Sequence, residues 1–317
     1  MSMDGVYRTR SLGVPATGIP DQYADGKAAK VWQHYIGGHK KRTESYREFF
    51  CNLLRERNIH NVLDVSCGTG VDSIMLLENG FCVTSVDASD KMLKDALRIR
   101  WNRRKEEPFD KWVIEEGNWL YLDDADIEPP EGGFDGIICL GNSFAHLPDF
   151  NGDLANQRVA MTNFMNFLKP GGWLIIDHRN YDAIIDTGKA PSKNLYYNSE
   201  CIEDIKTSVL LVDGRATMVT LDYTVDTSKA NIEKESESEP VAKKTKTESA
   251  TLSKFRLSYC PHRLANFSNL LKDIFGKNAE HITFGDFKPL GKIENPAYYV
   301  HLIQKPLTAN GDAQPEQ

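Results

Sequence analysis

The sequence predicts an α/β fold in which a largely parallel sheet carries helices on both faces, with a small β-rich subdomain inserted late in the chain. Between residues 41 and 180, short apolar runs alternate with segments of helical periodicity, which is typical of βαβ units. A glycine-rich turn follows the first apolar run, at 66–70. After residue 181 the alternation gives way to β-type stretches, which indicates the insertion.

The first strand, turn and helix are predicted to form the floor of a site for an adenosine-containing ligand. An apolar run at 62–65 is followed by Gly68 and Gly70 and then by helical spacing over 71–77. Glycines without side chains let a ligand approach the backbone, and a helix N-terminus offers unpaired N–H groups. Asp87 ends the next apolar run, where an acid can accept both hydroxyls of a ribose.

Two ligands fit such a turn. A dinucleotide-binding protein uses a third glycine for close helix packing over a pyrophosphate, and that position is Ser73. S-adenosylmethionine has no pyrophosphate, and Asp64 can hold its methionine part through water or backbone. The residues therefore favour the methyl donor over NAD, with an NAD oxidoreductase and a turn that binds nothing as the alternatives.

Composition narrows the class of protein. The 317 residues are 40% hydrophobic, enough for a sizeable core, and the apolar runs are too short to cross a bilayer. Residues 1–13 contain no apolar signal region, and the six cysteines include no CxxC pair, so they read as buried thiols in a reducing compartment. The net charge of -7 disfavours non-specific nucleic-acid binding. We expect a cytoplasmic protein with no nucleic-acid or membrane partner and no metal.

The chain is expected to divide into five segments. These are an N-terminal arm and helix (1–40), the core (41–180), an inserted subdomain (181–255) with a disordered polar stretch (227–250), a return to the core (256–306) and a polar tail (307–317). Helices are expected at 21–36, 43–57, 89–104, 154–168 and 263–275. Further strands are expected at 111–115, 134–140, 173–177, 208–212, 216–225, 255–259, 282–287 and 298–304.

Loops that follow the strands are expected to line the ligand crevice, because parallel strands present their carboxyl ends at one edge of the sheet. After the third strand, the amide of Asn118 and the indole of Trp119 are placed to hydrogen-bond and cover adenine. After the fourth, residues 141–147 are expected to face Gly68 and approach the reacting centre. A turn asparagine beside a packed tryptophan is the alternative for the first loop.

Several motifs together closely resemble the glycine N-methyltransferase family: DVSCGTGVDS, SVDASDKML, EEGNW, CLGNSFAHLPD, IDHRNYD, TLDYTV and KFRLSY. The resemblance extends from VYRTRSLG to GDFKP, almost the whole chain. It implies a Rossmann-like class I methyltransferase fold. It also implies transfer of a methyl group from S-adenosylmethionine to the amino group of glycine, which gives sarcosine and S-adenosylhomocysteine and buffers the methyl-donor ratio.

The resemblance also implies roles for individual residues. Arg42 would meet the methionine carboxylate, and Arg179 would hold the carboxylate of glycine, for which a planar guanidinium is suited. Asn142 and tyrosine oxygens would orient the neutral amine, and His146 is either a general base or a fixed hydrogen-bond partner. The implied donor-binding set is Tyr23, Trp32, Arg42, Ser66, Gly68, Asp87, Asn118, Trp119 and Leu140. The implied glycine-binding set is Tyr35, Asn142, His146, Arg179, Tyr197, Tyr223 and Tyr259.

Regulation enters through the same resemblance. It implies a homotetramer whose N-terminal arms enter neighbouring active sites and whose interface binds 5-methyltetrahydrofolate polyglutamate as an inhibitor. The matching positions are Tyr7, Leu210, Met218 and Phe255. Thr217 replaces a histidine of vertebrate relatives, and Thr17 replaces a glutamate of the arm; both departures concern regulation and cooperativity, not catalysis. The alternatives are a methyltransferase acting on sarcosine or another small amine, and a folate-binding regulatory protein with little turnover.

Overall fold

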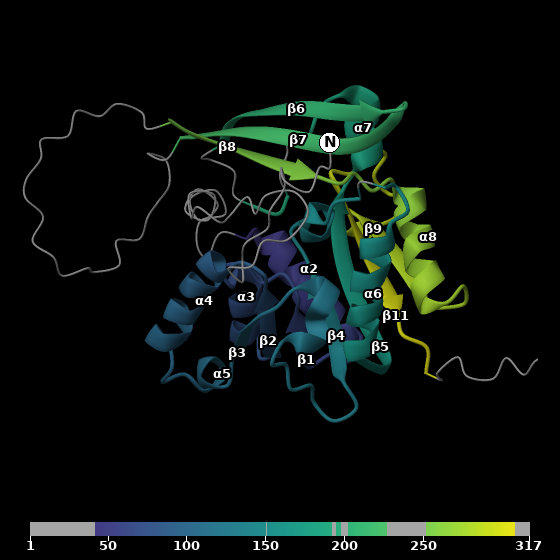
Figure 1. The fold of residues 1–317 in the computed structure, drawn as a ribbon. Helices are drawn as coiled ribbons and strands as arrows, with labels where there is room; N and C mark the ends of the chain where they lie inside the picture. Colours follow the sequence, from purple (N-terminus) through teal and green to yellow (C-terminus); the bar gives the residue numbers. More distant parts are fainter. Residues whose placement is uncertain (1–41, 150, 192–194, 198–201, 227–251, 308–317) are drawn as a thin grey trace, which may run out of the picture.

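The computed structural model describes residues 42–149, 151–191, 195–197, 202–226 and 252–307. Figure 1 shows a large sheet with helices on both sides and a smaller sheet packed across one end. The α/β fold is therefore confirmed. The predicted arm and helix (1–40), polar stretch (227–250) and most of the tail lie outside the described residues, and the division into segments stays a proposal.

The large sheet has eight strands in the order β10-β9-β11-β5-β4-β1-β2-β3. Its parallel part joins β1 to β2 and β4, β2 to β3, and β4 to β5. The antiparallel edge joins β11 to β5 and β9 to both β11 and β10. The strands are β1 (Asn61–Asp64), β2 (Cys82–Asp87), β3 (Val113–Glu116), β4 (Phe134–Cys139), β5 (Leu168–Arg179), β9 (His281–Gly285), β10 (Lys288–Pro289) and β11 (Tyr298–Gln304).

Alternate residues of these strands pack into two separate apolar cores, one on each face of the sheet. Val62 and Val300 belong to the core under α2 (Glu44–Glu56), α3 (Val71–Glu78) and α4 (Asp90–Asn102). Leu63 and Ile303 belong to the core under α6 (Ala155–Phe167) and α8 (Leu264–Phe275). Strands that are buried on both faces explain the nearly continuous apolar runs in the sequence.

Shorter elements fill the connections. They are α5 (Glu107–Asp110), η2 (Trp119–Asp124), η3 (Ser143–His146) and α7 (Tyr181–Thr187). The helix predicted at 43–57 is confirmed as α2, where the Thr43 hydroxyl caps the N-terminus by accepting from the Tyr46 N–H at 3.2 Å.

The two strands expected at 208–212 and 216–225 form a hairpin in the smaller sheet. β6 (Ile202–Val212) and β7 (Arg215–Asp226) are antiparallel and are joined by Asp213 and Gly214, both with positive φ, as a tight hairpin turn requires. β8 (Leu252–Tyr259) pairs with β7. Leu221 and Tyr223 point inward and join the core under α2 and α3, so the smaller sheet closes the carboxyl ends of the large one (Figure 1).

Some predicted strand boundaries were wrong: β6 begins at Ile202 and not at 208, and the start of β5 also differs. The expected helix at 154–168 and strand at 173–177 leave residues 169–172 as a break between them, but β5 already begins at Leu168. Its backbone is paired on both sides, because Leu168 pairs with Phe134 and Gly172 accepts from the Lys305 N–H. Pairing with neighbours distant in sequence overrides the local stop signal.

Candidate active site

The glycine turn lies at the switch point of the sheet, where β1 has β2 on one side and β4 on the other. Ligand sites of open α/β sheets form at such a point. Gly68 and Gly70 have φ of +54° and +86°, and a Cβ on Gly70 would lie 2.7 Å from the indole of Trp112. Both the left-handed backbone and the close packing therefore require glycine at Gly70.

Asp87 is fixed at the end of β2 by two backbone donors. Its Oδ2 accepts from the Gly68 N–H at 2.8 Å and its Oδ1 from the Ser89 N–H at 2.9 Å. A carboxylate has about four acceptor sites, so its bonds to the turn do not prevent Asp87 from meeting a ribose. The turn and the acid predicted to act together are thus joined by a direct hydrogen bond.

Asp64 lies beneath the turn and is buried. It accepts from the Ser66 N–H at 3.2 Å and from the Ser73 hydroxyl at 2.7 Å, and burial, with Asp72 second, raises its pKa to about 7. Ser73 also contacts the Ser85 hydroxyl at 2.8 Å. The hydroxyl of Ser73 therefore makes hydrogen bonds within the protein core. A dinucleotide-binding turn has glycine at this position.

Arg42 is a buried cation beside the turn. Its Nε and Nη2 donate to Asp72 of α3 at 2.9 and 2.5 Å, and its guanidinium lies 4.2 and 4.4 Å from the ring centres of Tyr46 and Tyr197. Burial opposes its charge, but Asp72 together with Tyr197 and Tyr46 outweighs burial, so the pKa of Arg42 stands well above its ordinary value. Its Nη1 is buried and has no hydrogen-bond partner in the described part of the chain. A ligand carboxylate would complete this group.

The adenine side of the site differs in one detail from the prediction. The indole N–H of Trp119 already donates to the Val65 carbonyl at 2.6 Å, and the ring stacks on Phe144. The Asn118 side-chain oxygen accepts from the Leu120 N–H at 3.0 Å. The expected hydrogen bond from the indole to adenine is therefore not available, which leaves Trp119 a covering role.

The opposite end of the crevice is built on the loop after β4. Asp177 accepts from the N–H groups of Gly141 and Asn142 at 2.9 and 2.6 Å, and burial raises its pKa to about 6. The Asn142 side-chain oxygen accepts from the Arg179 N–H at 2.9 Å and from the Tyr181 hydroxyl at 3.1 Å. The Tyr181 hydroxyl also lies 3.0 Å from the Asn142 side-chain nitrogen, so the amide of Asn142 is held between Tyr181 and the backbone of Arg179 and positions Arg179.

Arg179 is the buried cation of this end, with 5% of its surface exposed. Its Nη2 donates to the Tyr223 hydroxyl of the smaller sheet at 3.1 Å, and the guanidinium lies 5.0 Å from the ring centre of Tyr298. Tyr197 and Tyr259 are also buried, and Arg42 and Tyr197 form a backbone bridge. The structure thus gathers the described members of the predicted acceptor set around the ends of β4 and β5.

His146 packs on Tyr259, with ring centres 4.7 Å apart. Burial lowers the pKa of His146 to about 4. A base that weak is poorly matched to a substrate ammonium at neutral pH, which favours the reading of His146 as a fixed hydrogen-bond partner.

The predicted folate positions do not share one surface within the subunit. Leu210 and Met218 are register partners on the outer face of the β6–β7 hairpin. Phe255 lies on the inner face, where its ring stacks on Tyr223 at 4.8 Å. Phe255 therefore supports the acceptor end directly. Tyr7, and likewise Thr17, Tyr23, Trp32 and Tyr35, lie outside the described residues.

Sequence reasoning missed three residues that the structure places at the site: Asp72, Asp177 and Tyr181. Each acts on a predicted residue, since Asp72 pairs with Arg42, Asp177 holds the loop of Asn142, and Tyr181 bonds Asn142. In the sequence, Asp72 is recognisable as an acid in the first turn of a helix, and Asp177 as an acid at the end of a strand. Their partners, however, are distant in sequence.

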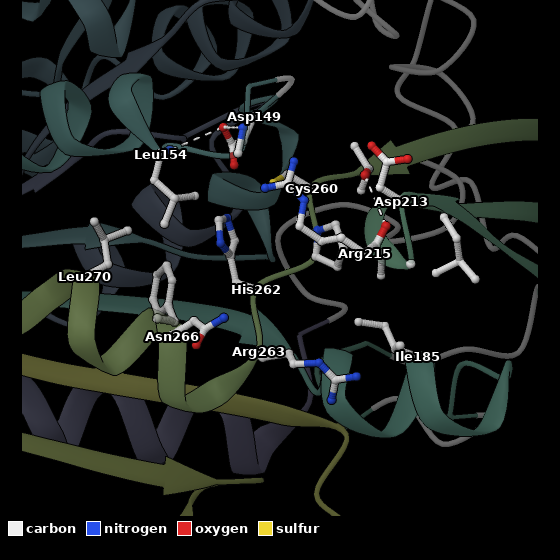
Figure 2. Close-up of a pocket in the computed structure, with 17 residues that line it drawn as sticks. Asp149, Leu154, Ile185, Asp213, Arg215, Cys260, His262, Arg263, Asn266 and Leu270 are labelled. Atoms are coloured by element: carbon white, nitrogen blue, oxygen red, sulfur yellow. Dashed lines mark hydrogen bonds between the residues drawn. The ribbon is translucent and has the colours of Figure 1, made fainter.

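A separate cavity of about 480 Å³ lies behind the acceptor end, between the loop before α6, the β6–β7 turn and α8 (Figure 2). Figure 2 shows Arg215, Cys260, His262 and Asn266 around it. Among the predicted donor and glycine residues that the structure describes, none lines this cavity.

Comparison with known proteins shows the family of this chain. The family described as "Methyltransferase domain" matches residues 57–250. Glycine N-methyltransferases of Rattus norvegicus and Homo sapiens are 56% and 55% identical over 306 residues, covering 96% of this chain and 99% of each relative. A glycine/sarcosine N-methyltransferase of Halorhodospira halochloris is 31% identical, covering 90% of this chain and 89% of the relative.

Solved structures agree on the fold alone. The crystal structure of an S-adenosylmethionine-dependent methyltransferase from Clostridium acetobutylicum matches with a TM-score of 0.59 at 17% identity, covering 89% of this chain and 99% of that one. Fold and site together define an S-adenosylmethionine-dependent methyltransferase. The chain belongs to the glycine N-methyltransferase family. Within the described ranges, no helix is long and apolar enough to cross a membrane.

Proposed function

We propose that this enzyme transfers the methyl group of S-adenosylmethionine to the amino group of glycine, forming sarcosine and S-adenosylhomocysteine. The observation that carries the proposal is Arg179, a buried guanidinium held by Asn142 and Tyr223 at the ends of β4 and β5. A small amino acid whose carboxylate pairs with that group would place its amine in the crevice facing the glycine turn. The names of the relatives at 55–56% identity support the same substrate.

The reaction needs alignment more than acid–base catalysis. The amine lone pair attacks the methyl carbon, the new N–C bond forms as the C–S bond breaks, and one proton is released. Fixed placement of the two reactants can lower the barrier by several kcal/mol. Positive charge on sulfur is dispersed as the methyl group moves, so neutral hydroxyls such as those of Tyr197 and Tyr223 suit the centre better than a carboxylate.

The donor is proposed to lie over the glycine turn. Asp87 takes the ribose hydroxyls, Nη1 of Arg42 takes the methionine carboxylate, and Trp119 covers the adenine. Ser66, Gly68, Asn118 and Leu140 line the same crevice. Tyr23, Trp32 and Tyr35 are proposed to complete it from the N-terminal segment.

The test is methyl transfer from labelled donor with glycine, with sarcosine and with no acceptor. Arg179→Lys is expected to lower kcat/KM for glycine by about 100-fold, because an ammonium cannot make the bidentate contact, and to leave donor binding by calorimetry unchanged. Arg256→Lys is the matched control, since Arg256 pairs with Asp222 on the exposed face of the smaller sheet. Full activity of Arg179→Lys would refute the carboxylate assignment.

A second acceptor, sarcosine, is favoured by the relatives at 31–32% identity, which are named glycine/sarcosine N-methyltransferases. Rates measured on both acceptors at equal concentration decide between the two.

The remaining proposals concern assembly and control in the cytoplasm. A homotetramer is proposed whose interface includes the outer end of the β6–β7 hairpin, where Leu210 and Leu211 are 51% and 59% exposed beside Met218. Inhibition by 5-methyltetrahydrofolate polyglutamate at that interface is the associated proposal. Light scattering of Leu210→Glu, which should dissociate the assembly, and donor turnover with and without the folate test the two separately.

A further inference from the structure

Three histidines form a row across the antiparallel edge of the sheet, behind Arg179. His178 of β5 and His301 of β11 are fully buried, and His281 of β9 is partly exposed. Their rings lie nearly parallel, at 16° and 23°, with centres 5.1 and 5.2 Å apart. Phe267 of α8 packs on the first two. The row belongs to neither the donor turn nor the cavity of Figure 2.

Hydrogen bonds run through the row in one direction only. His178 Nδ1 lies 2.8 Å from the Arg179 carbonyl, which can only accept, so Nδ1 carries the proton. In a neutral ring the other nitrogen is then an acceptor, and His178 Nε2 accepts from His301 Nε2–H at 3.0 Å. His301 Nδ1 in turn accepts from His281 Nε2–H at 3.0 Å. The three contacts are thus satisfied together by one set of tautomers, with the Arg179 carbonyl at one end of the row and His281 Nε2–H at the other.

The surroundings keep the row neutral. Burial lowers the pKa of His178 to about 4, against the opposing effects of its hydrogen bond to the Arg179 carbonyl and of Asp182 from α7. Burial and the neighbouring rings lower the pKa of His301, and burial with Lys272 of α8 lowers that of His281. His262, which also faces His178, has its pKa lowered by burial.

We propose that His178 is a positioning residue for Arg179, held in the donating tautomer by His301 and His281. This rests on the proposed function, in which Arg179 binds the substrate carboxylate. Asn142 holds the Arg179 N–H, Tyr223 accepts from the guanidinium and His178 holds the carbonyl, so the residue is restrained on three sides. With the peptide fixed, the guanidinium meets the carboxylate without having to be ordered by it.

The test compares His301→Leu, His301→Gln and Leu302→Ala in the full chain. Leucine leaves His178 Nε2 without its donor, so the ring can turn to the other tautomer and release the carbonyl. Glutamine can both donate to His178 and accept from His281. Leu302 is the matched control, because it is equally buried on the same strand but belongs to the core on the other face.

The expected result is a glycine KM raised about fivefold in His301→Leu, with kcat and donor affinity unchanged, and near-normal KM in His301→Gln. Leu302→Ala is expected to lower Tm without changing KM. A KM unchanged in His301→Leu, with only Tm lowered, would overturn the proposal. If His301→Leu does not fold, His281→Leu with Thr283→Val removes the donors to His301 Nδ1 and is read in the same way.

Solid-state NMR of protein labelled with ¹⁵N-histidine gives a reading that does not depend on turnover. Wild type is expected to show His178 as the Nδ1–H form and His301 and His281 as Nε2–H forms. A mixture of tautomers at His178 would overturn the proposal that the row holds His178 in one tautomer, whatever the substrate of the enzyme. If the tautomers are fixed but the protein does not methylate glycine, the proposed function is wrong and the arrangement of the three histidines stands.

Discussion

The ion pair between Arg42 and Asp72 makes a quantitative prediction. Asp72→Asn keeps the size of the side chain and removes its charge, leaving a buried guanidinium without a counter-ion. The side chains of the pair are only 5% and 12% exposed, and two hydrogen bonds join them. Breaking such a pair from one side costs about 3–5 kcal/mol, because the remaining charge stays desolvated. The free energy of unfolding should fall by about that amount.

The assay is denaturant unfolding, with thermal unfolding as a second reading. A loss of about 3 kcal/mol corresponds to a Tm lower by about 5–10 °C for a chain of this size. Asp273→Asn is the control, because its pair with Arg158 is 47% and 43% exposed and should contribute only about 0.5 kcal/mol. The double variant Arg42→Met, Asp72→Leu should recover most of the lost stability, since replacing both charges removes the uncompensated one.

Measuring ligand binding in the same variants distinguishes an effect on stability from an effect on function. The double variant should fold but bind S-adenosylhomocysteine poorly, because it lacks the guanidinium whose Nη1 is proposed to meet the ligand carboxylate. If the unfolding free energy of Asp72→Asn is no lower than that of Asp273→Asn, removing Asp72 does not leave Arg42 as an uncompensated buried charge. That result would refute the reasoning.

Three further predictions test other parts of the site. Gly70→Ala should lose at least about 2 kcal/mol of unfolding free energy, from the left-handed backbone and the contact with Trp112, and a stability unchanged in denaturant would contradict this. The pKa of His146 is about 4, below its unfolded value, so the stability that this group contributes is present above about pH 6.5 and declines as pH falls towards 4. His146→Asn should therefore flatten that decline in urea unfolding and leave the kcat/KM profile between about pH 6 and 8 unchanged; a lost inflection near pH 6.5 would instead make His146 a base. Tyr223→Phe removes the hydroxyl that accepts from Arg179 and should raise the glycine KM about fivefold with donor binding intact, which steady-state kinetics and calorimetry measure.

Features that depend on neighbours in sequence were predictable. The turn at Gly68 and Gly70 follows from backbone conformations that favour glycine, and its link to Asp87 follows from the length of one βαβ step. The hairpin turn at Asp213 and Gly214 is local in the same sense. These patterns carry the fold class and the donor end of the site, because short-range sterics and periodicity are written directly in the order of residues.

Features that depend on which strands pair were decided only by the tertiary structure. The start of β5 follows from pairing with β4 and with the chain after β11. Packing also decides that the side-chain oxygen of Asn142 faces the Arg179 backbone and Tyr181. The register also places Phe255 on Tyr223 and joins His178, His301 and His281 across three strands. A register shift of one residue would send each of these side chains to the opposite face, and no local pattern specifies that register.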